Sequence, residues 1–526
     1  MAVDVTDDMR DPSTPASVQI RTEARPPETD PRLGIAVTAP TGPAPTHRLV
    51  TVGDSLTHGF QSGAIYNTQI SYPRTIAWEM GWSEQFRYPR YGGPGGLPIN
   101  IEFVIRRLES EFGDKIDWWE AAAAVFAVRQ VMDQIEDYWE RGPGSVPPNT
   151  SAINHNLAVY GWDVRDALDR TSAYCAKAIK APKDDWFAQI VENANDRAAL
   201  RVLPPAIDDR GMSSVDAAEC LGKDGGIETL IVFLGANNAL GAVLTLKVAW
   251  SQAGASGNDY QRLDKKGAFT VWDPDHFAIE IAALEKRIAA IDARHVIWTT
   301  VPHVTIAPLA RGVHKKVRHG SRYFPYYTRP WIKDADFHPA DDPHITENEA
   351  RAIDSAIDQY NDAIVRIVRD ARAQGRDWYL LDLAGVLDRL ASRRYVEDPA
   401  ARPSWWRPYE LPEALQQLAP PPDAKFFASG PNGRTQGGIF SLDGVHPTTV
   451  GYGIVAQEFI NVMQLAGVPF YYGDGRTRRE GPIAVDFQRL IALDTLISDP
   501  PRSLNNDVHL VGWLDEKLDM LKRLFF

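Results

Sequence analysis

The segment VTVGDSLTHGF, residues 50–60, places a serine directly after an apolar run. An apolar run followed by glycine and small polar residues is typical of a β-strand that ends in a tight turn. Ser55 is then either the N-cap of a following helix, which is the commoner role, or a nucleophile at the carboxyl end of the strand. Because a serine hydroxyl is a poor nucleophile until a base takes its proton, the second role requires a histidine elsewhere in the chain.

The segment LDGVHPTTVGYGIVAQEF, residues 442–459, supplies a candidate base. Asp443 precedes His446 by three residues, a spacing that lets the carboxylate orient the imidazole and stabilise its protonated form. The residues after Pro447 have the pattern of an amphipathic helix, which would anchor this turn. Alone, the segment fits an ordinary surface turn equally well. Together with Ser55 it favours a serine–histidine–aspartate triad.

Two further strand ends carry groups that can donate to an oxyanion. In NLAVYGWDV, Gly161 follows a β-rich run, and the absence of a Cβ lets its backbone N–H approach a reacting carbonyl. In FLGANNALG, Asn237 follows another such run and can donate from its side-chain amide. Glycine and asparagine are also common turn residues, so either one alone is weak evidence. Three successive strand ends with a suitable donor favour an oxyanion hole.

These segments resemble four sequence blocks of the SGNH (GDSL) hydrolases, the family of bacterial GDSL lipases and esterases. The matching residues are GDSL at 53–56, NLAVYG at 156–161, GANN at 235–238 and DGVHP at 443–447. The third block of that family usually reads Gly-X-Asn-Asp, so Asn238 departs from the pattern.

The resemblance implies a role for each matched residue. Ser55 would be the nucleophile and one backbone donor of the oxyanion hole, with Gly161 and Asn237 as the other donors. His446 would be the base and Asp443 its orienting acid. It also implies a three-layer α/β/α sandwich of flavodoxin type, with a parallel sheet of strand order 2-1-3-4-5.

The distribution of apolar residues independently predicts an α/β fold. Short β-rich runs alternate with helix-period segments, which is typical of a mainly parallel sheet with helices on both faces. In such sheets, ligands bind at the carboxyl ends of the strands, where Ser55 falls. The β-rich runs are residues 48–52, 156–160, 229–234, 295–301 and 378–383.

The chain divides into three expected parts. Residues 1–46 contain eight prolines and no aromatic Phe, Trp or Tyr, so we expect a disordered tail. Residues 47–467 form the expected hydrolase domain, and residues 468–526 a C-terminal extension with an amphipathic helix. The connections between the β-rich runs are long, which predicts insertions in the domain at about 82–153, 166–226, 303–345 and 384–435.

Composition excludes several classes of function. A net charge of −13 without a basic run argues against nucleic-acid binding. The two cysteines, Cys175 and Cys220, fit neither a disulfide framework nor a zinc site. The apolar stretch 230–246 is short for a transmembrane segment. No signal segment is visible at the N-terminus, so we expect a cytoplasmic protein, with export by a non-classical route as the alternative.

We therefore expect a carboxylic ester hydrolase that works through an acyl-enzyme, with no metal and no organic cofactor. Its substrate is a small-molecule or lipid ester, and the first large insertion weakly favours the lipid. A carbohydrate acetylesterase and an acyltransferase are alternatives on the same fold. A non-catalytic binding protein that keeps the fold is the alternative of another class.

Overall fold

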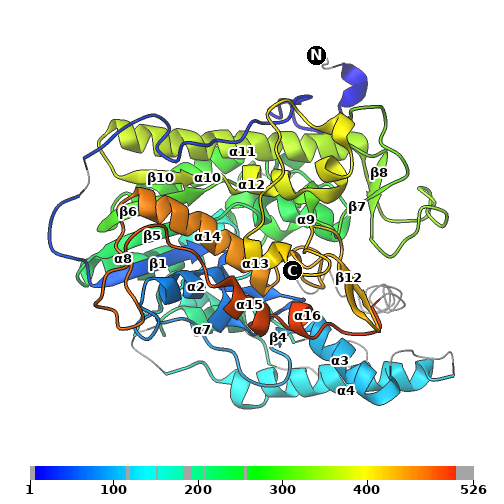
Figure 1. The fold of residues 1–526 in the computed structure, drawn as a ribbon, viewed down its shortest axis with the longest axis horizontal. Coiled ribbons are helices and arrows are strands. Elements are labelled where there is room, and N and C mark those ends of the chain that lie inside the picture. Colours follow the sequence, from blue (N-terminus) through cyan, green and yellow to red (C-terminus); the bar gives the residue numbers. More distant parts are fainter. Residues whose placement is uncertain are drawn as a thin grey trace.

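A parallel β-sheet forms the centre of the molecule. The computed structural model describes residues 6–38, 40–113, 119–149, 152–181, 191–206, 209–253 and 257–504. Within this part of the chain, four strands pair in the order β1-β5-β6-β10, all parallel (Figure 1). Their bounds are β1 His47–Gly53, β5 Ile227–Phe233, β6 Ala293–Thr299 and β10 Trp378–Leu381. Four of the five predicted strands are thereby confirmed.

The fifth prediction, a strand at 156–160, is wrong. These residues, all described, form only an isolated parallel bridge between Asn156 and Thr51. The N–H of Leu157 donates to Thr51 O at 2.8 Å, on the edge of β1 that β5 does not occupy. The side chain of Asn156 accepts from Ala158 N, and this local bond bends the backbone away from a regular ladder. The strand order 2-1-3-4-5 stays a prediction, because the sheet has four strands in the described chain.

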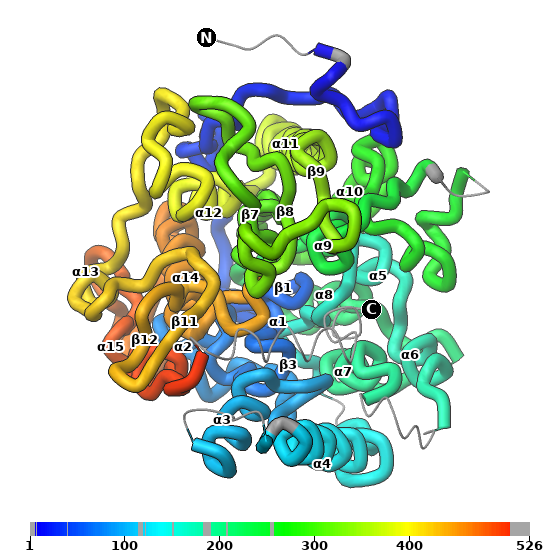
Figure 2. Tube along the Cα trace, turned by 90° about the vertical axis from the view of Figure 1, so that its right-hand side faces the viewer, coloured from blue at the N-terminus to red at the C-terminus, as the bar shows by residue number. Residues whose placement is uncertain are grey.

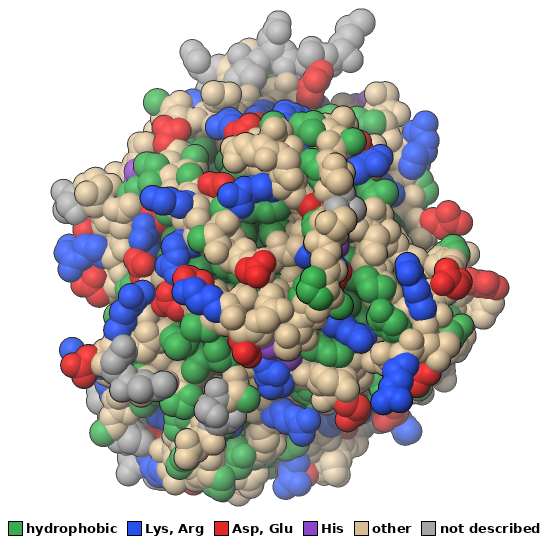
Figure 3. All heavy atoms as spheres, turned by 90° about the vertical axis from the view of Figure 1, so that its left-hand side faces the viewer, with side chains coloured by type: hydrophobic (Ala, Val, Ile, Leu, Met, Phe, Trp, Pro, Cys, Tyr) green, Lys and Arg blue, Asp and Glu red, His purple; other side chains and the backbone are tan. Residues whose placement is uncertain are grey.

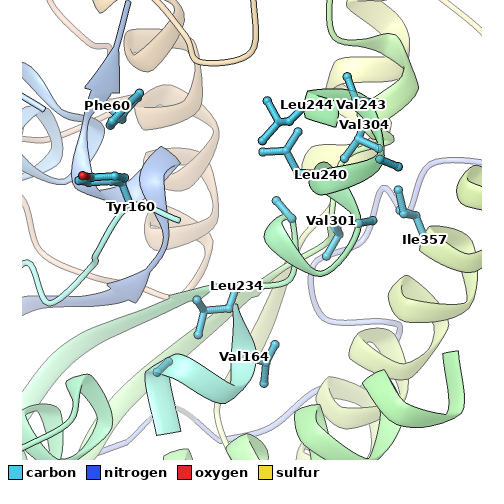
Figure 4. Packing of buried hydrophobic residues seen from close by; sticks show 14 of the residues in the cluster. Phe60, Tyr160, Val164, Leu234, Leu240, Val243, Leu244, Val301, Val304 and Ile357 are labelled. Carbon is cyan, nitrogen blue, oxygen red and sulfur yellow. The ribbon is translucent and has the colours of Figure 1, made fainter. Parts of the chain in front are cut away.

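Alternate side chains of the strands pack into two cores, one on each face of the sheet. Val50, Val232 and Val296 belong to one core, which is covered by three helices. These helices are α8 Ser214–Lys223, α10 Pro274–Ile288 and α11 Glu347–Ala373. The same core continues past the strand ends, where Leu234 lies beside Val164 (Figure 4).

The other face of the sheet has its own core. Leu49, Ile231 and Ile297 point to this side, because successive residues of a strand alternate between faces. The helices that cover them are α2 Tyr72–Glu79, α12 Leu383–Leu390 and α14 Thr449–Leu465. Helices thus cover both faces of the sheet, as the alternation of runs predicts for an α/β protein.

The expected insertions contribute helices and small antiparallel sheets. Figure 2 looks onto the carboxyl ends of the central strands, with α1 near the centre and these elements around it. The small sheets are β2-β3-β4 (Phe60–Gln61, Ala64–Ile65, Leu97–Pro98), β7-β8-β9 (Arg311–Val313, Tyr326–Thr328, Ile345–Thr346) and β11-β12 (Ala428–Gly430, Gly433–Gln436). The remaining α-helices are α1 Ser55–His58, α3 Ile101–Phe112, α4 Ala121–Glu140, α5 Val164–Asp169, α6 Ser172–Ala178, α7 Ala194–Val202, α9 Asn237–Thr245, α13 Glu413–Gln416, α15 Phe487–Leu493 and α16 Thr495–Ser498.

The N-terminal segment differs from the expected disordered tail. Its described residues run from α11 to β1 (Figure 1, dark blue), and Val18 is fully buried. The N–H of Gln19 donates to the side chain of Gln359 on α11 at 2.8 Å, and that side chain donates to Ser17 O at 3.0 Å. Composition misses this docking because it counts apolar burial alone, whereas polar side chains of α11 bind the extended backbone directly.

The C-terminal part is described up to residue 504. It contains α15 and α16, which follow the predicted domain boundary at 467. The amphipathic helix predicted in WLDEKLDMLKRLFF, residues 513–526, lies outside the described residues. Across the part of the chain that is described, none of the helices combines the length and the apolar character that a bilayer crossing requires.

Candidate active site

Ser55 is the first residue of α1, directly after β1. The N-cap of this helix is Asp54, whose Oδ1 accepts from Leu56 N at 3.0 Å. The capping role therefore falls to Asp54, and the Ser55 hydroxyl is left to a different partner. Gly53 is required at the turn, since a Cβ there would lie 2.2 Å from Thr57 Oγ1 and 2.9 Å from Phe233 O.

The three residues predicted as a triad form a continuous chain of hydrogen bonds. Ser55 Oγ lies 2.8 Å from His446 Nε2, and His446 Nδ1 lies 3.0 Å from Asp443 Oδ2. All three residues are buried, with Ser55 4% exposed. This is the geometry in which an imidazole can take the serine proton while a carboxylate fixes its tautomer.

Asp443 is held as a carboxylate by several donors. Its Oδ1 accepts from the N–H groups of Val445 and His446 at 2.9 and 2.8 Å, and its Oδ2 accepts from Gly63 N at 3.0 Å. Burial alone would raise the pKa of Asp443, but the His446 ring and these N–H donors together lower it. The carboxylate is thus kept ionised and oriented toward the imidazole.

The loop after α1 contacts the turn that carries His446. Ser62 N donates to Ser441 Oγ at 2.9 Å, and Leu442 N lies 3.4 Å from Ser62 Oγ. The ring of Phe60 packs on the ring of His446, with centroids 4.6 Å apart. The sequence analysis missed these contacts, because nothing in the residue types of 60–63 marks them as partners of a turn near residue 443.

Of the three predicted oxyanion donors, Gly161 lies in the loop before α5 and Asn237 is the first residue of α9. Gly161 has φ 74°, a left-handed backbone conformation that favours glycine. Asn237 Nδ2 donates at 2.8 Å to the carbonyl of Trp162, the residue that follows Gly161. An amide carries two N–H donors, so a second one remains on Asn237 for an oxyanion. The roles of Ser55 N, Gly161 N and Asn237 in such a hole stay predictions.

A buried histidine connects α1 to the Gly161 loop. His58 Nδ1 accepts from Tyr160 N at 3.1 Å, and His58 Nε2 lies 2.8 Å from Tyr91 Oη. Burial lowers the pKa of His58 to about 3, so the ring is neutral at ordinary pH. Its Nδ1 is therefore an acceptor and its Nε2 a donor. A second connection runs from Asn156 Nδ2 to Thr57 O at 2.9 Å.

A buried lysine fixes the other side of the same loop. Lys266 Nζ lies 2.6 Å from Asp163 Oδ2 and 2.7 Å from Asp166 Oδ2. The two aspartates form a capping box at the start of α5, immediately after Trp162. Because the lysine is only 10% exposed, its two ion pairs are weakly screened by water.

Asn238 follows Asn237 and is fully buried. Its Oδ1 lies 3.4 Å from Val164 N, and its Nδ2 has no hydrogen-bond partner among the described residues. A carboxylate at this position could accept from Val164 N in the same way, so the local bond to α5 does not depend on the aspartate that the resemblance predicts.

An apolar pocket lies beside the triad. Ser55 and His446 line it, together with aliphatic side chains that include Leu240, Leu387 and Val455. His303 also lines it, but its two ring nitrogens lie 3.1 and 3.3 Å from buried aspartates that hold it in place. The pocket suits a hydrocarbon group attached to a carbonyl at Ser55.

Comparison with known proteins gives no family assignment: no family model matches the chain, and no curated protein matches it.

Proposed function

We propose that the chain is a serine ester hydrolase of the SGNH type, with Ser55 as nucleophile. The observation that supports this most strongly is the buried hydrogen-bond chain from Ser55 Oγ through His446 to Asp443. Each of these bonds has the length that proton transfer and tautomer control require. Ser55 lies 391 positions before His446, so the fold, and not closeness in the sequence, brings the two residues together.

The proposed reaction has two halves. His446 Nε2 takes the hydroxyl proton as Ser55 Oγ attacks the ester carbonyl, and Asp443 stabilises the imidazolium. His446 then gives this proton to the leaving alcohol as the C–O bond breaks, which leaves an acyl group on Ser55. A water molecule, deprotonated by His446, attacks the acyl carbon, and the acid is released with the serine proton restored.

The oxyanion of each tetrahedral intermediate needs donors on one side of Ser55. Ser55 N at the start of α1, Gly161 N and the second N–H of Asn237 are the groups proposed for it. Two observations support the assignment: Asn237 bonds to the residue after Gly161, and His58 bonds to the residue before it. The loop is therefore held from both sides, as a preorganised donor must be.

Two features support the SGNH assignment beyond the triad. The segment at 156–160 lies along the edge of β1 opposite β5, where the second strand of a 2-1-3-4-5 sheet would run. Ser55 lies at the carboxyl end of β1, the edge at which α/β sheets bind ligands.

The substrate class follows from the pocket. Its aliphatic lining, which includes Leu240 and Val455, favours an acyl group with a hydrocarbon chain over a bare acetyl group, and its volume of about 70 Å³ limits the enclosed part of that chain to a few carbons. We therefore propose a lipid-like carboxylic ester.

The test is hydrolysis of p-nitrophenyl esters from acetate to palmitate. Wild type should turn over esters of intermediate chain length better than the acetate, and Ser55→Ala should lose this activity by several orders of magnitude. Ser498→Ala is the matched control. Among the described residues, the Ser498 hydroxyl donates only to the carbonyl of Asp494, the N-cap of the same short helix α16. A fluorophosphonate should label wild type and the control but not Ser55→Ala.

Full activity in Ser55→Ala would overturn the mechanism. An optimum at acetate would overturn the substrate class and favour an acetylesterase. Wild type that neither hydrolyses any ester nor takes the label would instead be a binding protein on this fold.

A further inference from the structure

A second pocket adjoins the first and has the opposite character. Its volume is about 380 Å³. The 3-10 helix Val304–Ile306 separates the two pockets, and Ile306 and Ala307 line both. The charged side chains of its lining are Arg311, Arg322, Arg393, Arg394, Lys425 and Glu397. Five cations with one carboxylate are a marked concentration in a chain of net charge −13. On the face that Figure 3 shows, by contrast, acidic and basic side chains are interspersed.

Three of the five cations have carboxylate partners. Arg394 Nη2 lies 2.8 Å from Asp354 Oδ2, and Lys425 Nζ lies 2.8 Å from Glu397 Oε1. Arg311 pairs with an aspartate on the loop after β8. For Arg322 and Arg393, no carboxylate lies within ion-pair distance in the described part of the chain. Asp354 and Asp358 act on Arg322 from beyond that distance, and Asp334 and Glu397 act on Arg393, yet the lining itself has five cations and one carboxylate.

Several N–H groups of Arg322 and Arg394 have no hydrogen-bond acceptor among the described residues. Arg322 is 6% exposed, and its Nε and Nη1 have no hydrogen-bond partner among the described residues. Its remaining nitrogen, Nη2, donates to Glu23 O at 3.2 Å. Arg394, 5% exposed, has an Nη1 that lies 3.9 Å from Asp388 Oδ1 but has no hydrogen-bond partner in the described chain. Buried donors without acceptors are costly, and an anion with several oxygens would satisfy them together.

Electrostatics within the pocket point the same way. Burial lowers the pKa of Arg393, and the neighbouring Arg311 lowers it further. The guanidinium of Arg393 lies 5.0 Å from the centroid of the Phe324 ring, which also lines the pocket. Like charges repel each other, and an anion bound between Arg311 and Arg393 would relieve the repulsion.

The second pocket also borders the turn of the catalytic base. Leu309 N, just after the shared wall, donates to Gly444 O at 3.0 Å, and Gly444 follows Asp443. Phe426 lines the cationic pocket and packs so closely on Gly444 that a Cβ there would lie 2.8 Å from its ring. The two pockets therefore share one wall, which lies against the turn that carries His446.

We propose that this pocket binds a phosphate group carried by the ester substrate, so that the enzyme acts on acyl esters with a phosphorylated alcohol. A phosphate dianion is opposite in charge to the five cations of the lining, and it offers several acceptors for the N–H donors of Arg322 and Arg394 that have no hydrogen-bond partner. This inference rests on the proposed ester hydrolysis for the site at Ser55. The phosphate site itself rests only on the arginines.

The first experiment measures binding without catalysis. Inorganic phosphate is titrated calorimetrically into Ser55→Ala and into Ser55→Ala with Arg393→Gln. Arg393 is chosen because it forms no ion pair within the described chain, so its replacement leaves no carboxylate without a partner. We expect binding that weakens at least tenfold with Arg393→Gln. Arg366→Gln removes an exposed arginine of α11 that lines neither pocket, and it should leave binding unchanged. Equal binding by the Arg393 and Arg366 variants would overturn the site.

The second experiment compares two esters, octanoylglycerol and octanoylglycerol phosphate, in otherwise wild-type protein. The ratio of kcat/KM should favour the phosphate ester at least tenfold, and Arg393→Gln should abolish the preference while Arg366→Gln keeps it. Inorganic phosphate should compete with the phosphate ester. Binding of phosphate without any preference between the esters would assign the site to free phosphate and overturn the substrate claim. Phosphate binding in a protein that hydrolyses no ester, p-nitrophenyl esters included, would overturn the proposed function but not the phosphate site.

Discussion

His58 Nδ1 accepts a hydrogen bond from the backbone N–H of Tyr160 at 3.1 Å. His58 is the last residue of the helix that begins with Ser55, and Tyr160 immediately precedes Gly161. Ser55, the proposed nucleophile, and Gly161, a proposed oxyanion donor, are therefore linked through one buried, neutral imidazole. The ring acts on the reaction only through the loop it holds, so His58 is a positioning residue.

Replacing His58 should change kcat more than KM. His58→Phe removes the acceptor for Tyr160 N, and we expect kcat for p-nitrophenyl esters to fall by about 10- to 100-fold, because small displacements of an oxyanion donor are costly. His58→Asn places an oxygen near the position of Nδ1 and should recover most of the loss. Steady-state kinetics of both variants check this. Equal losses in the two would show that His58 matters only for packing.

Asp443→Asn should leave the fold intact and lower kcat by about three to four orders of magnitude. The amide cannot stabilise the imidazolium, and it can hold His446 in the wrong tautomer. The matched control is Asp486→Asn, which changes the N-cap of α15 and touches no residue of the triad. Single-turnover kinetics and the melting temperature of both variants check the prediction. A loss of less than tenfold would contradict the assigned role.

Lys266→Met should disturb the Gly161 loop from its other side. It leaves the buried carboxylate of Asp163 without its cation and Asp166 with Arg170 alone, and removing one partner of a buried ion pair typically costs about 3 to 5 kcal/mol of the free energy of unfolding. We expect a lower melting temperature and a lower kcat. Adding Asp163→Asn to Lys266→Met removes the unpaired carboxylate and should restore part of the stability. A double variant as unstable as the single one would show that the ion pairs are not what holds the loop.

Asp54 should make stability fall as pH rises. Burial raises the pKa of Asp54 to about 7, although backbone N–H donors oppose the shift. In an unfolded chain the value is about 3.9, so the native state binds more protons between roughly pH 4 and pH 7. The free energy of unfolding therefore decreases across this range, by up to about 4 kcal/mol, and stays low above pH 7.

Asp54→Asn keeps the oxygen that accepts from Leu56 N and removes the ionisation. Its melting temperature should exceed that of wild type at pH 8, and the two should converge near pH 4. Asp494, also buried with its pKa raised by burial to about 7, should contribute to the same fall of stability with rising pH. A difference between Asp54→Asn and wild type that does not depend on pH would refute the linkage for Asp54.

The sequence alone could predict that Ser55, His446 and Asp443 come together, because each of them lies in a short segment with its own signature. Ser55 follows an apolar run and a glycine, and Asp443 and His446 share one turn, so residue types and spacing were sufficient. Four strands were predictable for a similar reason, since strands buried on both faces are nearly continuous apolar runs.

The parts that could not be predicted depend on contacts between distant segments. Lys266 is one of many lysines in the sequence, and only the fold brings it to Asp163. Arg322 and Arg393 are 71 positions apart, and neither lies in a basic run. Asn156 turned a predicted strand into a single bridge, because its side chain competes with the ladder for backbone groups.

Ser55 and His446 are separated by 391 positions along the chain. A ribosome adds about 5–20 residues per second, so roughly 20 to 80 s of synthesis pass between the nucleophile and its base. Throughout that time, on the proposed mechanism, the nascent chain holds a serine that cannot be activated. Catalysis is thus switched on only when the domain is almost complete, which keeps an incompletely folded chain from hydrolysing the esters around it.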